Sequence, residues 1–259
     1  MPRARVVPAA AGSLTLVLAV VIVGLVGGTA NAGRTRFGWL SDTETIPQRG
    51  VELQSWVHEM DGKGDSDATA TDQTLVWWAP IIGITDRLEL ALPVETAFTR
   101  TATTSSTQIL RFGAELRWRL VDADPVEAGP FAALIRVAAK RPVTARDVAR
   151  FEGELVFSYD AGPVHLVVDG GSIFDINTDT NGTSVLIRPG AGASIEVTNE
   201  LRVGAEVFSE LQVDGPGTSW VGAGPNVSYT HGRSWVSGSF LIGIEHIDLA
   251  PRVIWAIAF

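Results

Sequence analysis

The feature that most constrains this chain is an alternation of apolar and polar residues, which recurs in about a dozen segments. The clearest segment is 108–120, QILRFGAELRWRL. A strand places alternate side chains on opposite faces, whereas a helix would scatter these arginines all round its circumference. The pattern therefore predicts a strand with one charged face and one apolar face. The apolar face would carry Leu110, Phe112, Ala114, Leu116, Trp118 and Leu120.

Twelve such segments can be read, and their connections alternate between short turns and longer polar loops. This alternation is typical of outer-membrane barrels, which have short periplasmic turns and longer outer loops. The sequence predicts an all-β fold, a single antiparallel up-and-down transmembrane barrel of about 12 strands within residues 49–259. A soluble sandwich or lipocalin-type barrel, with the apolar face packed inside, is the alternative. The segments are 49–59, 73–84, 87–98, 107–120, 129–141, 150–160, 163–174, 184–197, 200–212, 218–229, 233–245 and 251–259.

Aromatic residues test the orientation of this barrel, because girdles of aromatics lie where the bilayer meets water. All the aromatics in question fall on the outward face of their strands. Those expected near the periplasmic ends are Trp118, Tyr159, Tyr229 and Phe259, and those near the outer ends are Phe98 and Phe151.

The N-terminus has the anatomy of a signal peptide. Arg3 and Arg5 precede an uncharged apolar run, and the small-residue triplet Ala30-Asn31-Ala32 follows it. This order predicts a cleaved signal peptide over residues 1–32, although a single membrane-spanning anchor is the alternative. Residues 33–48 are then expected to form a periplasmic N-terminal segment ahead of the barrel.

The last residues, PRVIWAIAF, place large apolar side chains at every second position and end on an aromatic. Val253, Trp255, Ile257 and Phe259 share the outward face. This ending resembles the sorting signal by which the barrel-assembly machinery recognises its substrates. We therefore expect localisation in the outer membrane of a Gram-negative bacterium. The expected partners there are that machinery, membrane lipid and lipopolysaccharide.

Composition excludes several classes of function. The net charge of −9 disfavours nucleic acid as a partner, and the absence of cysteine excludes disulfides, thiol chemistry and cysteine metal sites. No metal-ligand spacing, phosphate-binding glycine loop or nucleotide fingerprint occurs, so we expect no cofactor. The four histidines lack a serine suitably placed for a catalytic pair, so an enzyme, such as a lipid-modifying barrel, is the least favoured reading.

The inward faces carry charges of both signs, with twelve acids and seven bases on inward positions. Eight glycines, among them Gly113, Gly190 and Gly192, share these faces and would make room in the lumen. One reading is a narrow, mildly cation-favouring channel for small solutes. The other is a plugged structural or surface-interaction barrel with a paired charge network. The lumen-lining residues predicted are Glu52, Glu89, Arg111, Glu115, Arg117, Arg136, Glu154, Asp169, Arg188, Arg202, Glu206, Trp220 and Trp235.

Two short stretches add a resemblance to a family. TIPQRGVELQ at 45–54 and GITDRLELALPVE at 83–95 resemble the exported barrels named after the MetA pathway of phenol degradation, a transporter-like group. The motifs cover about thirty residues, and the strand pattern with its terminal Phe extends the likeness over the expected mature chain, residues 33–259. The resemblance implies a barrel that admits small, often aromatic or hydrophobic, solutes, and it supplies no binding residues.

Overall fold

The computed structural model describes residues 35–64, 71–101, 103–122 and 129–259. The predicted signal peptide lies outside the described residues. Within those ranges no helix is long and apolar enough to cross a membrane. The strands are β1 (Val51–Lys63), β2 (Thr71–Thr85), β3 (Leu88–Ala91), β4 (Val94–Arg100), β5 (Ser105–Val121), β6 (Phe131–Pro142), β7 (Val148–Ala161), β8 (Val164–Asn177), β9 (Thr183–Glu196), β10 (Leu201–Asp214), β11 (Trp220–His231), β12 (Ser234–Glu245) and β13 (Leu249–Ala258).

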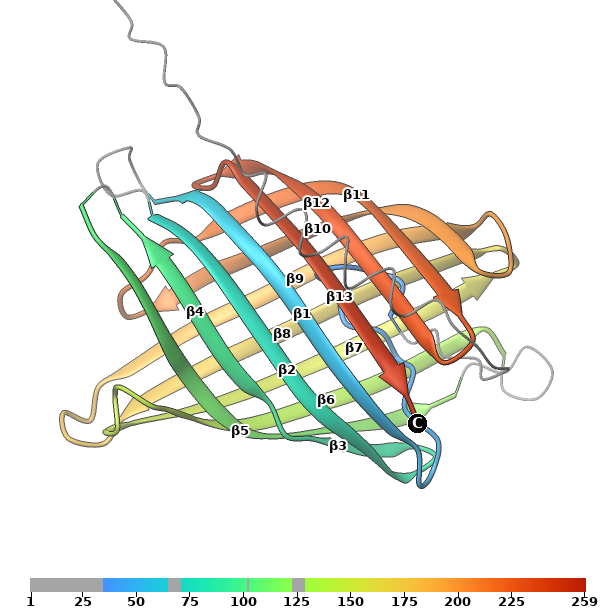
Figure 1. Cartoon of the computed structure of the whole chain (residues 1–259), viewed down its shortest axis with the longest axis horizontal. Helices are drawn as coiled ribbons and strands as arrows, with labels where there is room; N and C mark the ends of the chain where they lie inside the picture. The colour runs from blue at the N-terminus through green and yellow to red at the C-terminus, as the bar shows by residue number, and fades with distance from the viewer. Residues whose placement is uncertain (1–34, 65–70, 102, 123–128) are drawn as a thin grey trace, which may run out of the picture.

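The strands form one closed antiparallel sheet. Apart from β3 and β4, which do not pair with each other, each strand pairs with its neighbours in sequence, and β1 pairs with both β2 and β13, which closes the barrel. Figure 1 shows the strands crossing the molecule obliquely, the tilt that closure of a barrel requires. Because β3 and β4 act as one span, the barrel has twelve spanning strands, and the predicted fold class is confirmed.

The break between β3 and β4 has a local cause. Both strands pair with β2 on one side and with β5 on the other. Pro93 stands between them and lacks the N–H that a ladder needs. Its carbonyl still accepts a hydrogen bond from the Gly113 N–H at 3.1 Å. The wall is therefore continuous across this point.

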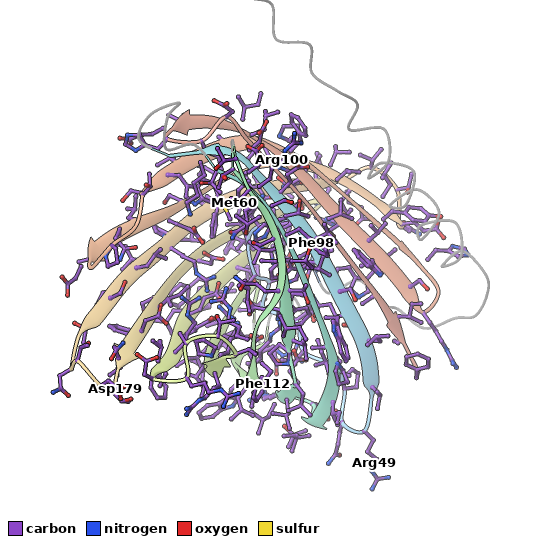
Figure 2. All side chains as sticks on the ribbon, turned by 60° about the vertical axis from the view of Figure 1, so that its left-hand side comes forward. Arg49, Met60, Phe98, Arg100, Phe112 and Asp179 are labelled. Atoms are coloured by element: carbon purple, nitrogen blue, oxygen red, sulfur yellow. The ribbon has the colours of Figure 1, made fainter. Side chains whose placement is uncertain are left out.

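The two ends of the barrel differ, as predicted. Connections at one end include the tight turns 86–87, 162–163 and 232–233. Those at the other end include 143–147 and 178–182, which are shorter than the sequence predicted because the strands extend further. The short-turn end faces the periplasm in barrels of this kind. Figure 2 shows Arg49 and Arg100 at opposite ends of the barrel, Arg49 at the short-turn end.

The outer surface is an apolar band. Trp118 is 53% exposed and Phe259 is 72% exposed, although both are large apolar side chains. Among the other predicted girdle residues, Phe98, Phe151 and Tyr159 are exposed, whereas Tyr229 is half-buried. On β13 the outward face holds Val253, Trp255 and Ile257 of the predicted assembly signal, and Phe259 follows directly after the strand, while Ile254 and Ala256 are buried inside. Such a surface suits contact with hydrocarbon rather than with water.

One predicted face assignment is wrong. Leu110 was expected on the lipid side but packs against the apolar cluster inside the barrel. The register between β4 and β5 shifts here, because Glu95 pairs with Arg111 while Thr96 pairs with Ile109. The extra residue of this β-bulge turns Leu110 inward, and Ile109 takes the outward position with 52% exposure.

Candidate functional site

Residues 35–48, here called the N-terminal segment, enter the barrel (Figure 1). The sequence led us to expect a segment ahead of the barrel on the periplasmic side. Instead Phe37, Trp39 and Leu40 are at most 5% exposed, and they share one apolar cluster with Phe208 and Trp220 of the wall. Burying these three side chains removes a large apolar area from water, which favours the docked position.

Glycines of β9 make the room that the N-terminal segment occupies. A Cβ on Gly192 would lie 2.6 Å from a ring carbon of Phe37 and 2.7 Å from a methyl of Leu40. A Cβ on Gly190 would overlap Leu40. The inward glycines predicted to widen the lumen thus form a seat for these two side chains.

Glu206 of β10 holds the backbone of the N-terminal segment. Its carboxylate accepts hydrogen bonds from the N–H groups of Gly38, Trp39 and Leu40 at 2.8, 3.0 and 3.1 Å. Glu206 is only 3% exposed. Three donors aimed at one carboxylate compensate for the cost of burying that charge.

Further polar contacts continue along the segment toward the short-turn end. The Ser41 N–H donates to Asp169 at 3.0 Å, and the Ser41 hydroxyl donates to Glu154 at 3.0 Å. The hydroxyls of Thr43 and Ser158 lie 2.7 Å apart. Together with Glu206, these contacts fix the segment to β7, β8 and β10.

Asp42 is a charged member of the N-terminal segment with two partners. The Arg36 guanidinium donates to its carboxylate at 2.9 Å, and Nε2 of His165 lies 3.2 Å from it. The other ring nitrogen of His165 lies 2.7 Å from Asp160. Burial alone would raise the pKa of Asp42, but Arg36 and His165 outweigh burial and hold that pKa below its usual range.

The segment leaves the interior at the short-turn end. The Ile46 N–H donates to Glu89 at 2.7 Å, and the Gln48 N–H donates to Asp86 at 2.9 Å. Arg49 follows with φ 67°, a left-handed conformation that turns the chain into β1. The motif 83–95, on which the family resemblance rests, thus contributes two of the residues that hold this turn.

A network of ion pairs covers the inner wall of β5, β6 and β7. Arg136 is its centre: it contacts Glu115 at 2.8 Å and Glu152 at 3.3 Å, and it also contacts Glu154. Lys140 contacts Glu152 at 3.0 Å. Charges of opposite sign on adjacent strands thus replace a hydrophobic core on this side of the barrel.

The network extends to the neighbouring strands. Glu95 accepts from Arg111 at 2.5 Å and from Lys140 at 2.8 Å. Arg117 donates to Glu115 at 2.6 Å. Every one of these side chains thus has an opposite charge beside it, so the charges on this part of the wall are paired.

Beside the network lies a cavity of about 450 Å³. Its lining joins charged residues of the wall to Trp39 and Leu40 of the N-terminal segment and to Trp56 and Trp77 of β1 and β2. The volume falls in the range of small-molecule sites, about 300–1,000 Å³. The interior is therefore partly filled by the segment and partly open.

Stacked rings form one side of this cavity. His58 stacks on Trp39 and on Trp56 with ring centroids 4.8 Å apart in each case. The guanidinium of Arg252 lies 4.5 Å from the Trp56 ring centroid and 5.2 Å from that of Trp39. Strands β1 and β13 and the N-terminal segment thus meet at one aromatic group.

The sequence-predicted lumen residues separate into two sets. Among the residues that the structure describes, no group of three or more His, Cys, Asp or Glu side chains is arranged to hold a metal ion. Those that line the cavity are Arg111, Glu115, Arg117, Arg136, Glu154 and Arg188. Those elsewhere in the interior or at its rim are Glu52, Glu89, Asp169, Arg202, Glu206, Trp220 and Trp235.

Several residues of the second set have specific structural partners. Glu206, Asp169 and Glu89 accept hydrogen bonds from the backbone of the N-terminal segment. Glu52 accepts from the indole N–H of Trp235 at 3.0 Å. These four acids do not line the cavity. The lining of the cavity holds equal numbers of carboxylates and cations. The carboxylates are Asp42, Glu44, Glu95, Glu115, Glu152, Glu154, Asp175 and Glu210. The cations are Lys63, Arg111, Arg117, Arg136, Lys140, Arg150, Arg188 and Arg252.

Sequence reasoning missed two contributors to the cavity. Trp39 belongs to a stretch, RFGWL at 36–40, whose apolar residues could have indicated a buried segment. Arg252 precedes the outward Val253 on the terminal strand, so the same alternation places it inward.

No family model and no curated protein matches this chain. Solved structures do match its fold. An outer membrane channel from Pseudomonas putida F1 is 12% identical with a TM-score of 0.56, over 85% of this chain and 99% of that one. The translocator domain of the autotransporter NalP from Neisseria meningitidis is 11% identical with a TM-score of 0.53, over 96% of each chain.

A third similar structure is the KdgM porin in complex with disordered oligogalacturonate, 9% identical with a TM-score of 0.51, over 80% of this chain and 99% of that one. At such identities the likeness concerns the fold. The closed barrel and its apolar outer band place this protein in the bacterial outer membrane.

Proposed function

We propose that this protein is a narrow outer-membrane channel for small solutes, and that the N-terminal segment constricts it. The observation that carries the proposal is the cavity of about 450 Å³, lined by paired charges and by side chains of the segment. A purely structural barrel does not need to keep a polar cavity of this size inside. Two of the similar structures are described as an outer membrane channel and a porin, which supports the same function.

The solute class we propose is small molecules with flat or apolar parts. Support comes from Trp39, Trp56 and Trp77, which line the cavity together with Leu75 and Leu134. Aromatic faces and aliphatic side chains beside fixed charges are typical of sites that bind such molecules. The resemblance of 83–95 to transporter-like barrels points in the same direction.

The proposal also includes the route to the membrane. We propose that Val253, Trp255, Ile257 and Phe259 form the signal read by the barrel-assembly machinery. The outer band then contacts lipid and lipopolysaccharide. The exposure of Ile257 and Phe259 on the outer face, at 38% and 72%, supports both roles.

Recording of single channels in a planar bilayer tests the transport function. We expect a small conductance with weak ion selectivity, because the cavity lining is balanced in charge. Glu206→Ala should increase the conductance or the frequency of opening, because it releases the N-terminal segment. Uptake of small solutes into liposomes that contain the protein provides a second readout.

A plugged structural barrel is the alternative, and one observation favours it. The N-terminal segment buries Phe37, Trp39 and Leu40 and is held by hydrogen bonds along its length. Under this alternative the wild type and Glu206→Ala would both be silent in the bilayer, and neither would admit solutes into liposomes. That pair of results would refute the channel.

A further inference from the structure

Arg252 is an interior charge without an opposite charge in contact. Among the described residues no carboxylate lies within 4 Å of its guanidinium, and its Nε is buried without a hydrogen-bond partner. The nearby acids are already used: Glu206 binds the backbone of the N-terminal segment, and Glu154 binds Arg136 and Ser41. An interior guanidinium in this state is costly unless something else compensates its charge.

Arg188 on β9 is in a similar state. Its nearest carboxylate among the described residues belongs to Glu152, at 3.8 Å, and Glu152 already pairs with Lys140 at 3.0 Å. The Nε of Arg188 is also buried without a hydrogen-bond partner. Both arginines line the same cavity, and their positive charges are close enough to repel one another.

The surroundings of Arg252 strengthen its attraction for an anion. Trp39 and Trp56 cover it at 5.2 and 4.5 Å, so water is excluded from part of the guanidinium. A charge with less water around it interacts more strongly with an opposite charge. The open side faces the cavity of about 450 Å³.

We propose that Arg252 and Arg188 form a binding site for a small organic carboxylate within the cavity. A carboxylate matches the planar fork of a guanidinium and can accept two parallel N–H bonds from it. One anion between the two arginines would compensate both charges and remove their repulsion. Trp39 supplies one wall of the site, so the site is complete only when the N-terminal segment is docked.

Trifluoroacetate, a carboxylate with a ¹⁹F signal, is the probe we choose. The full-length barrel in detergent should broaden its ¹⁹F line, and an excess of acetate should reverse the broadening. Neutral trifluoroethanol should show no such effect. Arg252→Gln and Arg188→Gln should each weaken binding at least fivefold.

Arg202→Gln is the matched control, because Arg202 is an inward arginine that contacts Glu196 at 3.0 Å and lies outside the cavity. It should bind the probe as the wild type does. Heat-modifiable mobility on a gel reports whether each variant folds, and Arg188→Gln carries the test if Arg252→Gln does not fold. Equal broadening in the wild type and in both folded arginine variants, or displacement by chloride as readily as by acetate, would overturn the proposal.

The proposal deepens the proposed channel function, yet the two can fail separately. The binding experiment needs no conduction. A barrel that binds trifluoroacetate but is silent in a bilayer keeps the site and loses the channel. A barrel that conducts without binding the probe keeps the channel and loses the site.

Discussion

Glu206→Ala tests whether a single carboxylate keeps the N-terminal segment docked. The substitution leaves the N–H groups of Gly38, Trp39 and Leu40 without their acceptor, at the three distances of 2.8, 3.0 and 3.1 Å. Hydrogen bonds to a charged group contribute about 1.5–3 kcal/mol each, and water that enters from the cavity recovers part of the loss. We therefore expect docking to weaken by about 3 kcal/mol, or about 100-fold in the docking equilibrium.

The absence of cysteine makes the assay simple. Thr43→Cys introduces a unique thiol at a position that is 3% exposed when the segment is docked. A polar thiol reagent should label this thiol about 100-fold faster in the Glu206→Ala background, because labelling requires undocking. Glu200→Ala, in the turn 197–200, removes an exposed carboxylate and should leave the rate unchanged. A less than threefold increase with Glu206→Ala would show that these bonds do not hold the segment.

Four other substitutions test the faces, the assembly signal and the docking of the segment. Leu116→Arg should destabilise the barrel by about 2–4 kcal/mol in urea unfolding, because Leu116 lies on the outer face. Gln73→Arg, in the cavity lining, should lower the free energy of unfolding much less. Equal losses of stability would contradict the assignment of faces. Phe259→Asp should lower the yield in the outer membrane while export to the periplasm continues, as fractionation would show. Gly192→Val should displace Phe37 and Leu40 and raise the Thr43→Cys labelling rate, whereas Gly170→Val should not, because a Cβ at Gly170 would have nothing within 4 Å. Asp42→Asn should speed hydrogen exchange of residues 37–43 relative to the wild type at pH 6. Ionised Asp42 stabilises the docked segment through Arg36 and His165. Because the folded pKa of Asp42 lies below its usual value of about 3.9, this stabilisation is present above that pH and is lost below it. The exchange rates of Asp42→Asn and of the wild type should therefore converge in acid.

The alternation of residues was sufficient to predict the wall of the barrel. In 108–120 each face is uniform enough that a one-residue slip would place arginines against lipid, so the register is strongly determined. The same reasoning failed at Leu110, because a bulge adds one residue to a strand and reverses the faces beyond it. Nothing in the local pattern marks that extra residue.

The contacts inside the barrel were less predictable. The alternation along a strand tells whether a side chain points inward, but not which residue it contacts. Glu206 and Arg136 were both expected to point inward, yet one binds the backbone of the N-terminal segment and the other binds three carboxylates. Which role an inward charge takes depends on contacts far apart in sequence, such as the 168 positions between Gly38 and Glu206. The glycines illustrate the same limit, since Gly113 makes no room: a Cβ there would overlap the carbonyl of Ala139.

The position of the N-terminal segment also bears on how the barrel closes. Closure joins β1 to β13, which lie about two hundred residues apart along the chain, whereas all other neighbouring strands are joined by local connections. Trp39 lies only about a dozen residues before β1 begins. Its indole N–H donates to the carbonyl of Ala250 on β13 at 2.9 Å. Once this contact forms, the loop to be closed shrinks from about two hundred residues to about twelve, which reduces its entropic cost by about 2.5 kcal/mol. The segment thus acts as a tether for the seam, holding the first strand beside the last.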